Sequence, residues 1–259
     1  MSDLIADRPA EVLIVVPARF ASVRFPGKPL ALLGEKPLVQ WTWEAAMRAS
    51  DLGDVVVATE DERIAEAVRG FGGTAVMTGA AARNGTERCA EVAARRPGAK
   101  LVINLQGDSP LVRRSDIAAL VDAWRATGAA MLTPWLACDA ATEARLLADA
   151  AAGRVGGTTV VADRAGNALY FSKRVLPHGA RPKLHIGLYA YTPAALAAYA
   201  GWAPGALELA EGLEQLRFLE NGMGIRLVEV PAPEAGFWEV NNAEDVPLVA
   251  SALGGAVGL

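Results

Sequence analysis

Short apolar runs alternate with amphipathic segments along the first half of the chain. Residues 12–16 (VLIVV) are β-branched and apolar on both faces, which is typical of a strand buried inside a parallel sheet. Residues 54–59 (DVVVAT) and 100–105 (KLVINL) predict two more strands, and residues 36–49 and 61–69 predict helices. Because strand and helix alternate, we expect an α/β fold with a mostly parallel central sheet and flanking helices.

The second half of the chain has a different pattern. Residues 158–163 and 167–171 predict an antiparallel pair across a turn, and residues 225–230 predict the last strand. We therefore expect a small antiparallel subregion beside the parallel sheet.

Two helices are also expected in this half. Residues 207–218 (LELAEGLEQLRF) predict one helix, with Leu209, Leu213 and Leu216 as its buried stripe. Residues 139–152 predict an alanine-rich helix, to which we assign no functional role.

The composition is that of a globular protein without a strong charge. The chain has 259 residues, of which 52% are hydrophobic and 21% charged, so it can bury a substantial core. We expect residues 11–259 to form a single domain after a flexible segment, residues 1–10. The net charge of −4 argues against a nucleic-acid-binding protein that depends on a bulk positive field. No apolar run approaches the length of a membrane span, so we expect neither nucleic acid nor membrane as a partner.

Cysteine usage indicates the compartment. Cys89 and Cys138 are the only cysteines, and their spacing matches neither a metal site nor a disulfide framework. The first ten residues lack the apolar core of a secretory signal peptide. These features predict a protein of the reducing cytoplasm.

A cationic loop follows the first predicted strand. It carries Arg19, Ser22, Arg24 and Lys28, and a Pro-Gly pair bends it. In open α/β sheets the ligand crevice lies outside the carboxyl ends of the strands, which is where this loop begins. Arginine offers phosphate oxygens a planar fork, and lysine offers a point charge. The loop is therefore a candidate binding site for a triphosphate.

Residues 17–30 (PARFASVRFPGKPL) resemble the amino-terminal signature of the 3-deoxy-manno-octulosonate (KDO) cytidylyltransferases, also called CMP-KDO synthetases. The resemblance implies a Rossmann-like nucleotidyltransferase fold, a homodimer, and transfer of CMP from CTP to a small acidic acceptor such as KDO, with release of pyrophosphate. It also implies catalytic roles for Arg19 and Lys28. A basic surface loop on an unrelated α/β domain is the alternative. The nucleotide-binding residues implied for this loop are Ala18, Arg19, Ser22, Arg24 and Lys28.

A second matching segment opens a predicted helix. Residues 84–88 (NGTER) resemble the family's S-G-T-E-R loop, with Asn84 in place of serine. Gly85 permits close backbone approach, and Thr86 can cap the helix so that its amino end faces a ligand. The resemblance implies that Asn84, Gly85, Thr86 and Arg88 recognise the nucleotide, particularly its base. A plain capping turn is the alternative.

A carboxylate follows the strand predicted at 100–105. Residues 106–110 (QGDSP) resemble the family's Q-G-D-E-P, with Ser109 in place of glutamate, and the resemblance adds Gln106 to the nucleotide-binding residues. A carboxylate in a crevice lined by cations is costly unless it binds a metal or a cation. Hard oxygen ligands suit Mg²⁺, which shares its other positions with water and substrate phosphates. Asp108 is therefore a candidate catalytic residue and Mg²⁺ ligand, and an Asp-Ser-Pro turn without metal is the alternative.

A second metal ligand is expected near the end of the chain. The family carries G-V-D-T-P-E-D where this chain has FWEVNNAED, residues 237–245. Asn241 thus replaces a metal-binding aspartate, which keeps one oxygen ligand but removes a negative charge. The V-N-N segment also resembles the metal-binding asparagine segment of UDP-N-acetylglucosamine pyrophosphorylases, so Asn241 stays a candidate ligand. A simple asparagine turn is the alternative.

Three segments resemble the family's acceptor-binding region. Residues 168–173 (ALYFSK) match A-L-Y-F-S-R except for the lysine. Residues 185–191 (HIGLYAY) resemble the family's H-I-G-I-Y-G-Y strand, which predicts one strand there, and residues 207–217 match a helix ending in L-E-Q-L-R. A structural histidine and a solvated or dimer-facing helix are the alternatives. The resemblance implies that the acceptor contacts Lys173, His185, Tyr189, Glu214 and Gln215.

Together these residues predict nucleotidyl transfer by positioning and electrostatic stabilisation, because no Ser or Cys nucleophile with a base partner is recognisable. Lys173, the altered connection after it and Asn241 leave open a second hypothesis, in which the acceptor is a phosphonate such as phosphonoformate. A third is a non-catalytic nucleotide-binding regulator, against which Lys28 and Asp108 argue. The sequence also leaves open the transfer of UMP or another nucleotide.

Overall fold

The computed structural model describes residues 11–21, 25–233, 249 and 251–253. The predictions for residues 1–10 and for Ser22, Arg24 and Asn241 lie outside the described residues. The strands of the main sheet are β1 (Val12–Pro17), β4 (Asp54–Thr59), β5 (Ala75–Met77), β6 (Leu101–Leu105), β7 (Met131–Ala137), β8 (Thr159–Ala162), β9 (Ala168–Ser172), β10 (Lys183–His185), β11 (Leu188–Tyr191) and β12 (Arg226–Glu229).

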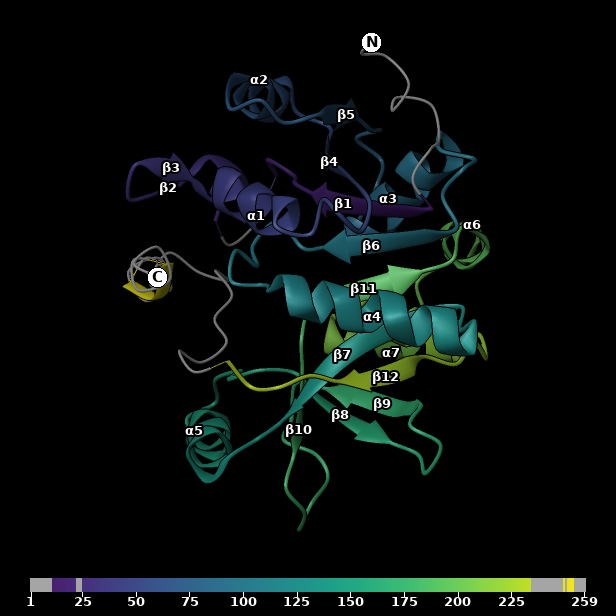
Figure 1. The fold of residues 1–259 in the computed structure, drawn as a ribbon. Helices are drawn as coiled ribbons and strands as arrows, with labels where there is room; N and C mark the ends of the chain where they lie inside the picture. The colour runs from purple at the N-terminus through teal and green to yellow at the C-terminus, as the bar shows by residue number, and fades with distance from the viewer. Residues whose placement is uncertain (1–10, 22–24, 234–248, 250, 254–259) are drawn as a thin grey trace.

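These strands form one sheet in the order β5-β4-β1-β6-β11-β7-β10-β8-β9, and β12 pairs with β7 (Figure 1). A separate hairpin consists of β2 (Leu32–Leu33) and β3 (Lys36–Pro37). Two apolar cores lie on the two faces of the sheet, and helices cover both. The helices are η1 (Lys28–Leu30, a 3-10 helix), α1 (Leu38–Met47), α2 (Glu62–Gly70), α3 (Gly85–Ala94), α4 (Arg114–Thr127), α5 (Ala140–Ala151), α6 (Pro193–Gly201), α7 (Ala206–Glu211) and α8 (Leu216–Glu220).

The parallel half of the sheet is centred on β1, which pairs in parallel with β4 and β6, while β4 pairs in parallel with β5. Every residue of β1 is buried, with Ile14 and Val16 in one core and Leu13 and Val15 in the other. The prediction of a strand buried on both faces is confirmed. The carboxyl ends of β1 and β6 point to the same edge of the sheet, at the left in Figure 1.

The other half of the sheet is mostly antiparallel. β11 runs antiparallel to β6 and β7, β10 to β7 and β8, and β8 to β9, whereas β12 is parallel to β7. The α/β class with flanking helices and the hairpin within residues 158–171 are confirmed. The sheet is mixed, however, because its antiparallel part extends from β6 to β9 and is not a small subregion.

The prediction of one strand over residues 185–191 is wrong. β10 ends at His185 and β11 begins at Leu188. The Leu188 N–H donates to the Ile186 carbonyl oxygen at 2.7 Å, so the chain turns tightly at Gly187. The apolar residues on both sides of the turn face the protein interior, and their pattern therefore continues across it.

The prediction of one helix over residues 207–218 is also wrong. α7 ends before Gly212, whose φ of 61° lies in the left-handed region, and α8 begins at Leu216. Leu216 is buried as expected, whereas Leu209 is 71% exposed, so the predicted stripe fails at that position. Glycine just after a helix is a stop signal that the leucine spacing obscured.

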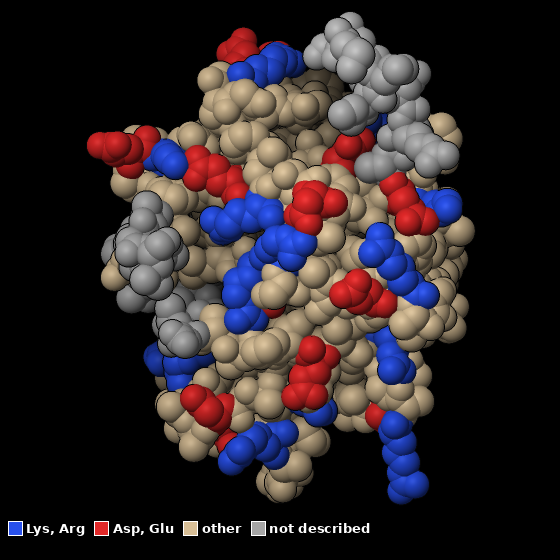
Figure 2. Space-filling model, viewed as in Figure 1, with Lys and Arg blue, Asp and Glu red and all other residues tan. Residues whose placement is uncertain are grey.

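None of the described helices is long and apolar enough to cross a membrane. Cys89 and Cys138 are buried free thiols, and burial raises the pKa of both. Lys and Arg side chains are interspersed with Asp and Glu over the face in Figure 2, in keeping with the net charge of −4.

Candidate active site

A cleft of about 940 Å³ lies at the edge of the sheet where β1 and β6 end. Loops after β1, before α3 and after β6 form one side, and α5, β10, β11 and the connection between α7 and α8 form the other. The structure brings together there all but one of the described residues predicted for the site. Those lining the cleft are Ala18, Arg19, Lys28, Asn84, Gly85, Arg88, Gln106, Asp108, Lys173, His185, Tyr189, Glu214 and Gln215.

The loop after β1 folds so that Lys28 reaches the cleft. The Gly27 N–H donates to the Phe20 carbonyl oxygen at 3.0 Å, and Gly27 has a φ of 71°, a conformation that favours glycine. Lys28 then begins η1. On the same loop, Arg19 Nη1 donates to the Arg83 carbonyl oxygen at 3.2 Å. This bond ties the loop to the segment before α3.

Lys28 forms an ion pair with Asp108. Lys28 Nζ lies 2.6 Å from Asp108 Oδ2, and the two side chains remain 15% and 27% exposed. Asp108 follows Gly107, where a Cβ atom would lie only 2.6 Å from the Pro17 carbonyl oxygen. The end of β1 and the loop after β6 therefore approach as closely as a glycine permits. A carboxylate in this cleft was expected to bind a metal or a cation, and Lys28 is the described cation that binds Asp108.

The amino end of α3 adjoins the cleft, where Asn84 and Gly85 line it. Asn84 caps this helix, because its Oδ1 accepts a hydrogen bond from the Glu87 N–H at 2.9 Å. The prediction that Thr86 caps it is wrong. Thr86 is fully buried, its hydroxyl oxygen lies 3.0 Å from the Tyr191 hydroxyl oxygen, and it does not line the cleft. The residue that departs from the family pattern thus supplies the cap.

Arg88 contacts the loop after β1 indirectly, through Glu60. It is 2% exposed, its Nη2 lies 2.8 Å from Glu60 Oε2, and its Nη1 donates to the Thr78 hydroxyl oxygen. Glu60 Oε1 in turn accepts a hydrogen bond from the Phe20 N–H at 3.1 Å. Arg88 therefore acts on the loop's shape through Glu60.

Glu214 connects the two sides of the cleft. Its Oε1 accepts a hydrogen bond from Gln106 Nε2 at 2.8 Å, and its Oε2 accepts one from the Thr86 N–H at 3.3 Å. Burial raises the pKa of this carboxyl above its ordinary value. Although the resemblance assigned Glu214 to the acceptor, both of its oxygens bind groups from the segments predicted to bind the nucleotide.

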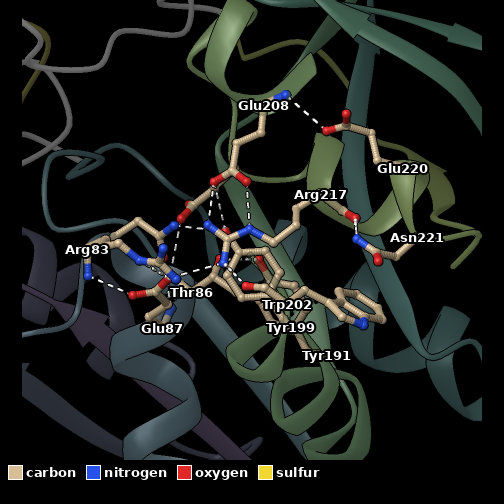
Figure 3. A network of polar contacts seen from close by, with 12 residues as sticks. Arg83, Thr86, Glu87, Tyr191, Tyr199, Trp202, Glu208, Arg217, Glu220 and Asn221 are labelled. Atoms are coloured by element: carbon tan, nitrogen blue, oxygen red, sulfur yellow. Dashed lines mark hydrogen bonds and ion pairs between the residues drawn. The ribbon is translucent and has the colours of Figure 1, made fainter. Parts of the chain in front are cut away.

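A buried ion network holds the segment before α3 (Figure 3). Arg217 is 1% exposed, with Nη2 2.5 Å from Glu208 Oε1 and Nη1 3.1 Å from Glu87 Oε1. Arg83 Nη2 lies 2.6 Å from the same Glu87 oxygen. Burial alone would raise the pKa of Glu87, but hydrogen bonds from Arg83 and Arg217 outweigh it and lower that pKa. The buried Arg217 and the half-exposed Arg83 together balance the two carboxylates, so the network as a whole carries no net charge.

The far end of the cleft offers neutral hydrogen-bonding groups. His185 contacts Phe171 edge-on with ring centroids 5.0 Å apart, and burial lowers the pKa of His185 to about 3, so its ring is neutral at physiological pH. The Tyr189 hydroxyl donates to Gln215 Oε1 at 3.3 Å. Gln215 Nε2 is buried and has no partner in the described part of the chain.

Comparisons with known proteins agree with the sequence motifs. A family model described as cytidylyltransferase matches residues 13–225. The 3-deoxy-manno-octulosonate cytidylyltransferase of Maricaulis maris is 44% identical, over 90% of this chain and 93% of the relative. That of Vibrio cholerae is 40% identical, over 91% and 95%. This chain belongs to the KDO cytidylyltransferase family.

A solved structure supports the assignment of the fold. The structure of CMP:2-keto-3-deoxy-manno-octonic acid synthetase complexed with CTP is 34% identical to this cytidylyltransferase, with a TM-score of 0.82. The match covers 95% of this chain and 99% of that chain. The predicted family, nucleotidyltransferase fold and enzyme class are therefore confirmed, and the hypothesis of a non-catalytic regulator loses its support.

A charged wall of this cytidylyltransferase was not predicted from the sequence. Arg145 and Asp149 of α5, together with Arg154, line the cleft. Asp149 Oδ1 accepts a hydrogen bond from Arg154 Nη2 at 2.7 Å, and Arg145 Nη1 donates to the Gly156 carbonyl oxygen at 3.2 Å. The helix to which no role was assigned thus forms part of the site. The four-residue spacing of Arg145 and Asp149, followed by a glycine pair, is the signal that could have indicated this.

Lys173 also lines the cleft. Its backbone N–H donates to Glu211 Oε2 at 3.0 Å, and its Nζ donates to the Gly212 carbonyl oxygen at 3.5 Å. A Cβ atom at Gly212 would lie 2.9 Å from Lys173 Nζ. Gly212 therefore both ends α7 and leaves room for the ammonium group.

Proposed function

We propose that this cytidylyltransferase transfers CMP from CTP to 3-deoxy-manno-octulosonate and releases pyrophosphate. The pair of Lys28 and Asp108 carries the proposal, because it sets a cation for phosphate beside a carboxylate for a metal at the end of a central strand. The relatives support the choice of substrates: two are KDO cytidylyltransferases, and the solved synthetase was complexed with CTP.

The nucleotide occupies the side of the cleft built from the loops after β1, before α3 and after β6. The acceptor's hydroxyl oxygen attacks the α-phosphorus, the bond from that phosphorus to the oxygen of the leaving pyrophosphate breaks, and the hydroxyl proton passes to solvent. Catalysis then rests on positioning and electrostatic stabilisation, with Arg19 and Lys28 neutralising the triphosphate. The further residues proposed for the nucleotide are Ala18, Ser22, Arg24, Asn84, Gly85 and Gln106, with Arg88 acting through the loop.

Asp108 is the described residue that fits Mg²⁺. Its carboxylate is partly exposed in the cleft beside a phosphate-binding cation, and Mg²⁺ commonly takes one or two carboxylates and completes its shell with water and phosphate oxygens. Among the described residues no group of three or more His, Cys, Asp or Glu side chains converges as a metal site, which suits a metal shared with substrate. Bound Mg²⁺ would polarise the phosphate oxygens. Asn241 is proposed as its second protein ligand.

The acceptor occupies the opposite side. Its carboxylate faces positive charge from Arg145, Arg154 and Lys173. Its hydroxyl groups face His185, Tyr189 and Gln215. An unpartnered buried donor such as Gln215 Nε2 is costly, and a ligand oxygen would satisfy it. Glu214 couples this side to the nucleotide side through Gln106.

Pyrophosphate release tests the proposed function. Purified protein is given CTP and Mg²⁺ with KDO, with phosphonoformate or with no acceptor, and UTP and ATP replace CTP in parallel. We expect release that depends on CTP and KDO together. Release with the phosphonate alone would overturn the choice of acceptor, and equal release with UTP would overturn the choice of nucleotide.

We further propose that residues 11–259 act as one domain and that the enzyme is a cytoplasmic homodimer. The family resemblance supports the dimer, and two free cysteines suit a reducing compartment. Light scattering on a sizing column tests the dimer directly. A mass near that of one 27.0 kDa chain would overturn it.

A further inference from the structure

The buried hydroxyl group of Thr133 contacts both sides of the break between β10 and β11. Thr133 lies on β7, between the positions that pair with β10 and those that pair with β11, and is fully buried. Its Oγ1 lies 2.9 Å from His185 Nε2 and 2.8 Å from the Leu188 carbonyl oxygen. The Ile186 carbonyl oxygen lies 3.4 Å away. This side chain therefore contacts the chain on both sides of the turn at Gly187.

The Thr133 hydroxyl group has one proton, and this determines which nitrogen of the His185 ring is protonated. A carbonyl oxygen only accepts, so the bond from Thr133 Oγ1 to Leu188 uses that proton. His185 Nε2 must then donate to a lone pair of Thr133 Oγ1. Because burial keeps this ring neutral at physiological pH, the lone pair of the imidazole lies on Nδ1.

The Nδ1 atom of His185 makes no hydrogen bond within the described part of the chain. It is not among the described buried side-chain atoms that lack a partner, so it keeps some contact with solvent. The residue itself lines the cleft. Nδ1 is therefore an open hydrogen-bond acceptor, on the same side of the cleft as the unpartnered donor Gln215 Nε2.

We propose that Thr133 is a positioning residue that holds His185 as the Nε2–H tautomer, so that Nδ1 accepts a hydrogen bond from a hydroxyl group of the substrate acceptor. This inference rests on the proposed function, because it concerns the acceptor side of that site. A neutral nitrogen lone pair binds a group that has a proton to donate, and it repels the lone pairs of an ionised carboxylate or phosphonate oxygen. The tautomer therefore selects hydroxylated acceptors over fully ionised small anions.

Long-range ¹H–¹⁵N NMR reads the tautomer without any ligand. The chain has two histidines, and His178 is exposed, so a His178→Ala background leaves only the signals of His185. At pH 7 we expect a pyridine-type shift for Nδ1 and a pyrrole-type shift for Nε2. An Nδ1–H ring, or an even mixture of tautomers, would overturn the proposal.

Two variants of Thr133 connect the tautomer to substrate binding. Thr133→Val removes the hydroxyl at nearly constant volume, and Thr133→Ser keeps it. For Thr133→Val we expect mixed tautomers and a KM for KDO raised roughly five- to tenfold, from the loss of one hydrogen bond, with an unchanged KM for CTP. Thr133→Ser should match the wild type in both readouts.

Equal increases in both KM values, or an unchanged tautomer in Thr133→Val, would contradict the positioning role. If Thr133→Val does not fold, the wild-type spectrum still tests the tautomer, and a changed tautomer or a raised KM for KDO in Thr133→Ser would contradict the positioning role. If the wild type turns over no KDO, the proposed function fails, and the spectrum still shows whether the tautomer was assigned correctly.

Discussion

Lys28 Nζ and Asp108 Oδ2 lie 2.6 Å apart although 80 residues separate them along the chain. The pair joins the loop after β1 to the loop after β6 at the carboxyl edge of the sheet. Because both side chains remain partly exposed, their attraction contributes little to folding. The arrangement instead places a cation and a carboxylate where a nucleotide and its metal would meet, so we expect changes there to affect catalysis more than stability.

Replacing Asp108 with Asn should lower kcat by roughly 10²- to 10³-fold, because the carboxylate that stabilises the transition state through Mg²⁺ is lost. CTP binding should weaken much less, since Lys28 and Arg19 remain. Pyrophosphate release gives kcat, and calorimetry gives the Kd for CTP. Asp122→Asn is a matched control, because the Asp122 side chain is 77% exposed on α4. Near wild-type turnover in Asp108→Asn would remove Asp108 from the mechanism.

Replacing Lys173 with Met should raise the KM for the acceptor about tenfold or more, because a charge-assisted hydrogen bond to its carboxylate is lost. The KM for CTP should not change. Steady-state kinetics with each substrate varied in turn measures the split. Arg164→Met, on the exposed turn between β8 and β9, is the control. An increase in the KM for CTP alone would place Lys173 on the nucleotide side.

His185 should make stability depend on pH. Its folded-state pKa of about 3 lies below the ordinary value of 6.5, so its contribution is complete above pH 6.5 and is lost as the pH falls toward 3. Within that window the free energy of unfolding should fall by up to about 1.4 kcal/mol per pH unit relative to a His185→Gln variant. Urea unfolding at pH 7, 6, 5 and 4 measures the difference. His178→Gln should keep the wild-type slope, and an equal slope in His185→Gln would refute the prediction.

Replacing Arg217 with Met should destabilise the fold by about 3–5 kcal/mol, because Glu87 and Glu208 lose their buried partner. Arg69→Met is the comparison, since Arg69 and its partner Glu62 are 52% and 55% exposed. Thermal unfolding should show a large fall in Tm for Arg217→Met and little change for Arg69→Met. Similar Tm values for the two variants would show that the network is not a structural brace.

The two sides of the cleft differ in how far the sequence could predict them. Lys28 and Asp108 lie in the loops that follow two buried parallel strands, and the ends of such strands share an edge, so local patterns were sufficient to predict that these loops meet. Arg145 and Arg154 lie on a helix and a loop whose distance from that edge depends on how the antiparallel strands cross the sheet. No local pattern encodes that crossing, so the charged wall of Arg145, Asp149 and Arg154 was not predicted.

Tertiary contacts also determine which residue caps α3 and where two of the predicted elements break, and local sequence patterns left both open. Thr86 and Asn84 can both cap a helix, and the hydroxyl partner that buries Thr86, Tyr191, is 105 residues away. At Gly187 the apolar spacing continues across a break, because Ile186 and Leu188 are both buried. At Gly212 the leucine spacing of the sequence also continues across a break, although Leu209 on the α7 side is 71% exposed. Period alone cannot separate one long element from two short ones in such cases.

The identity of the product tests the central claim most directly. The protein is incubated with CTP, Mg²⁺ and KDO and followed by ³¹P NMR. The account predicts that a new phosphodiester signal of a CMP-sugar and the signal of pyrophosphate grow in equal amounts, and that neither grows without KDO. CTP that stays intact in the presence of KDO, or a CMP anhydride that forms with phosphonoformate while no product forms with KDO, would contradict it.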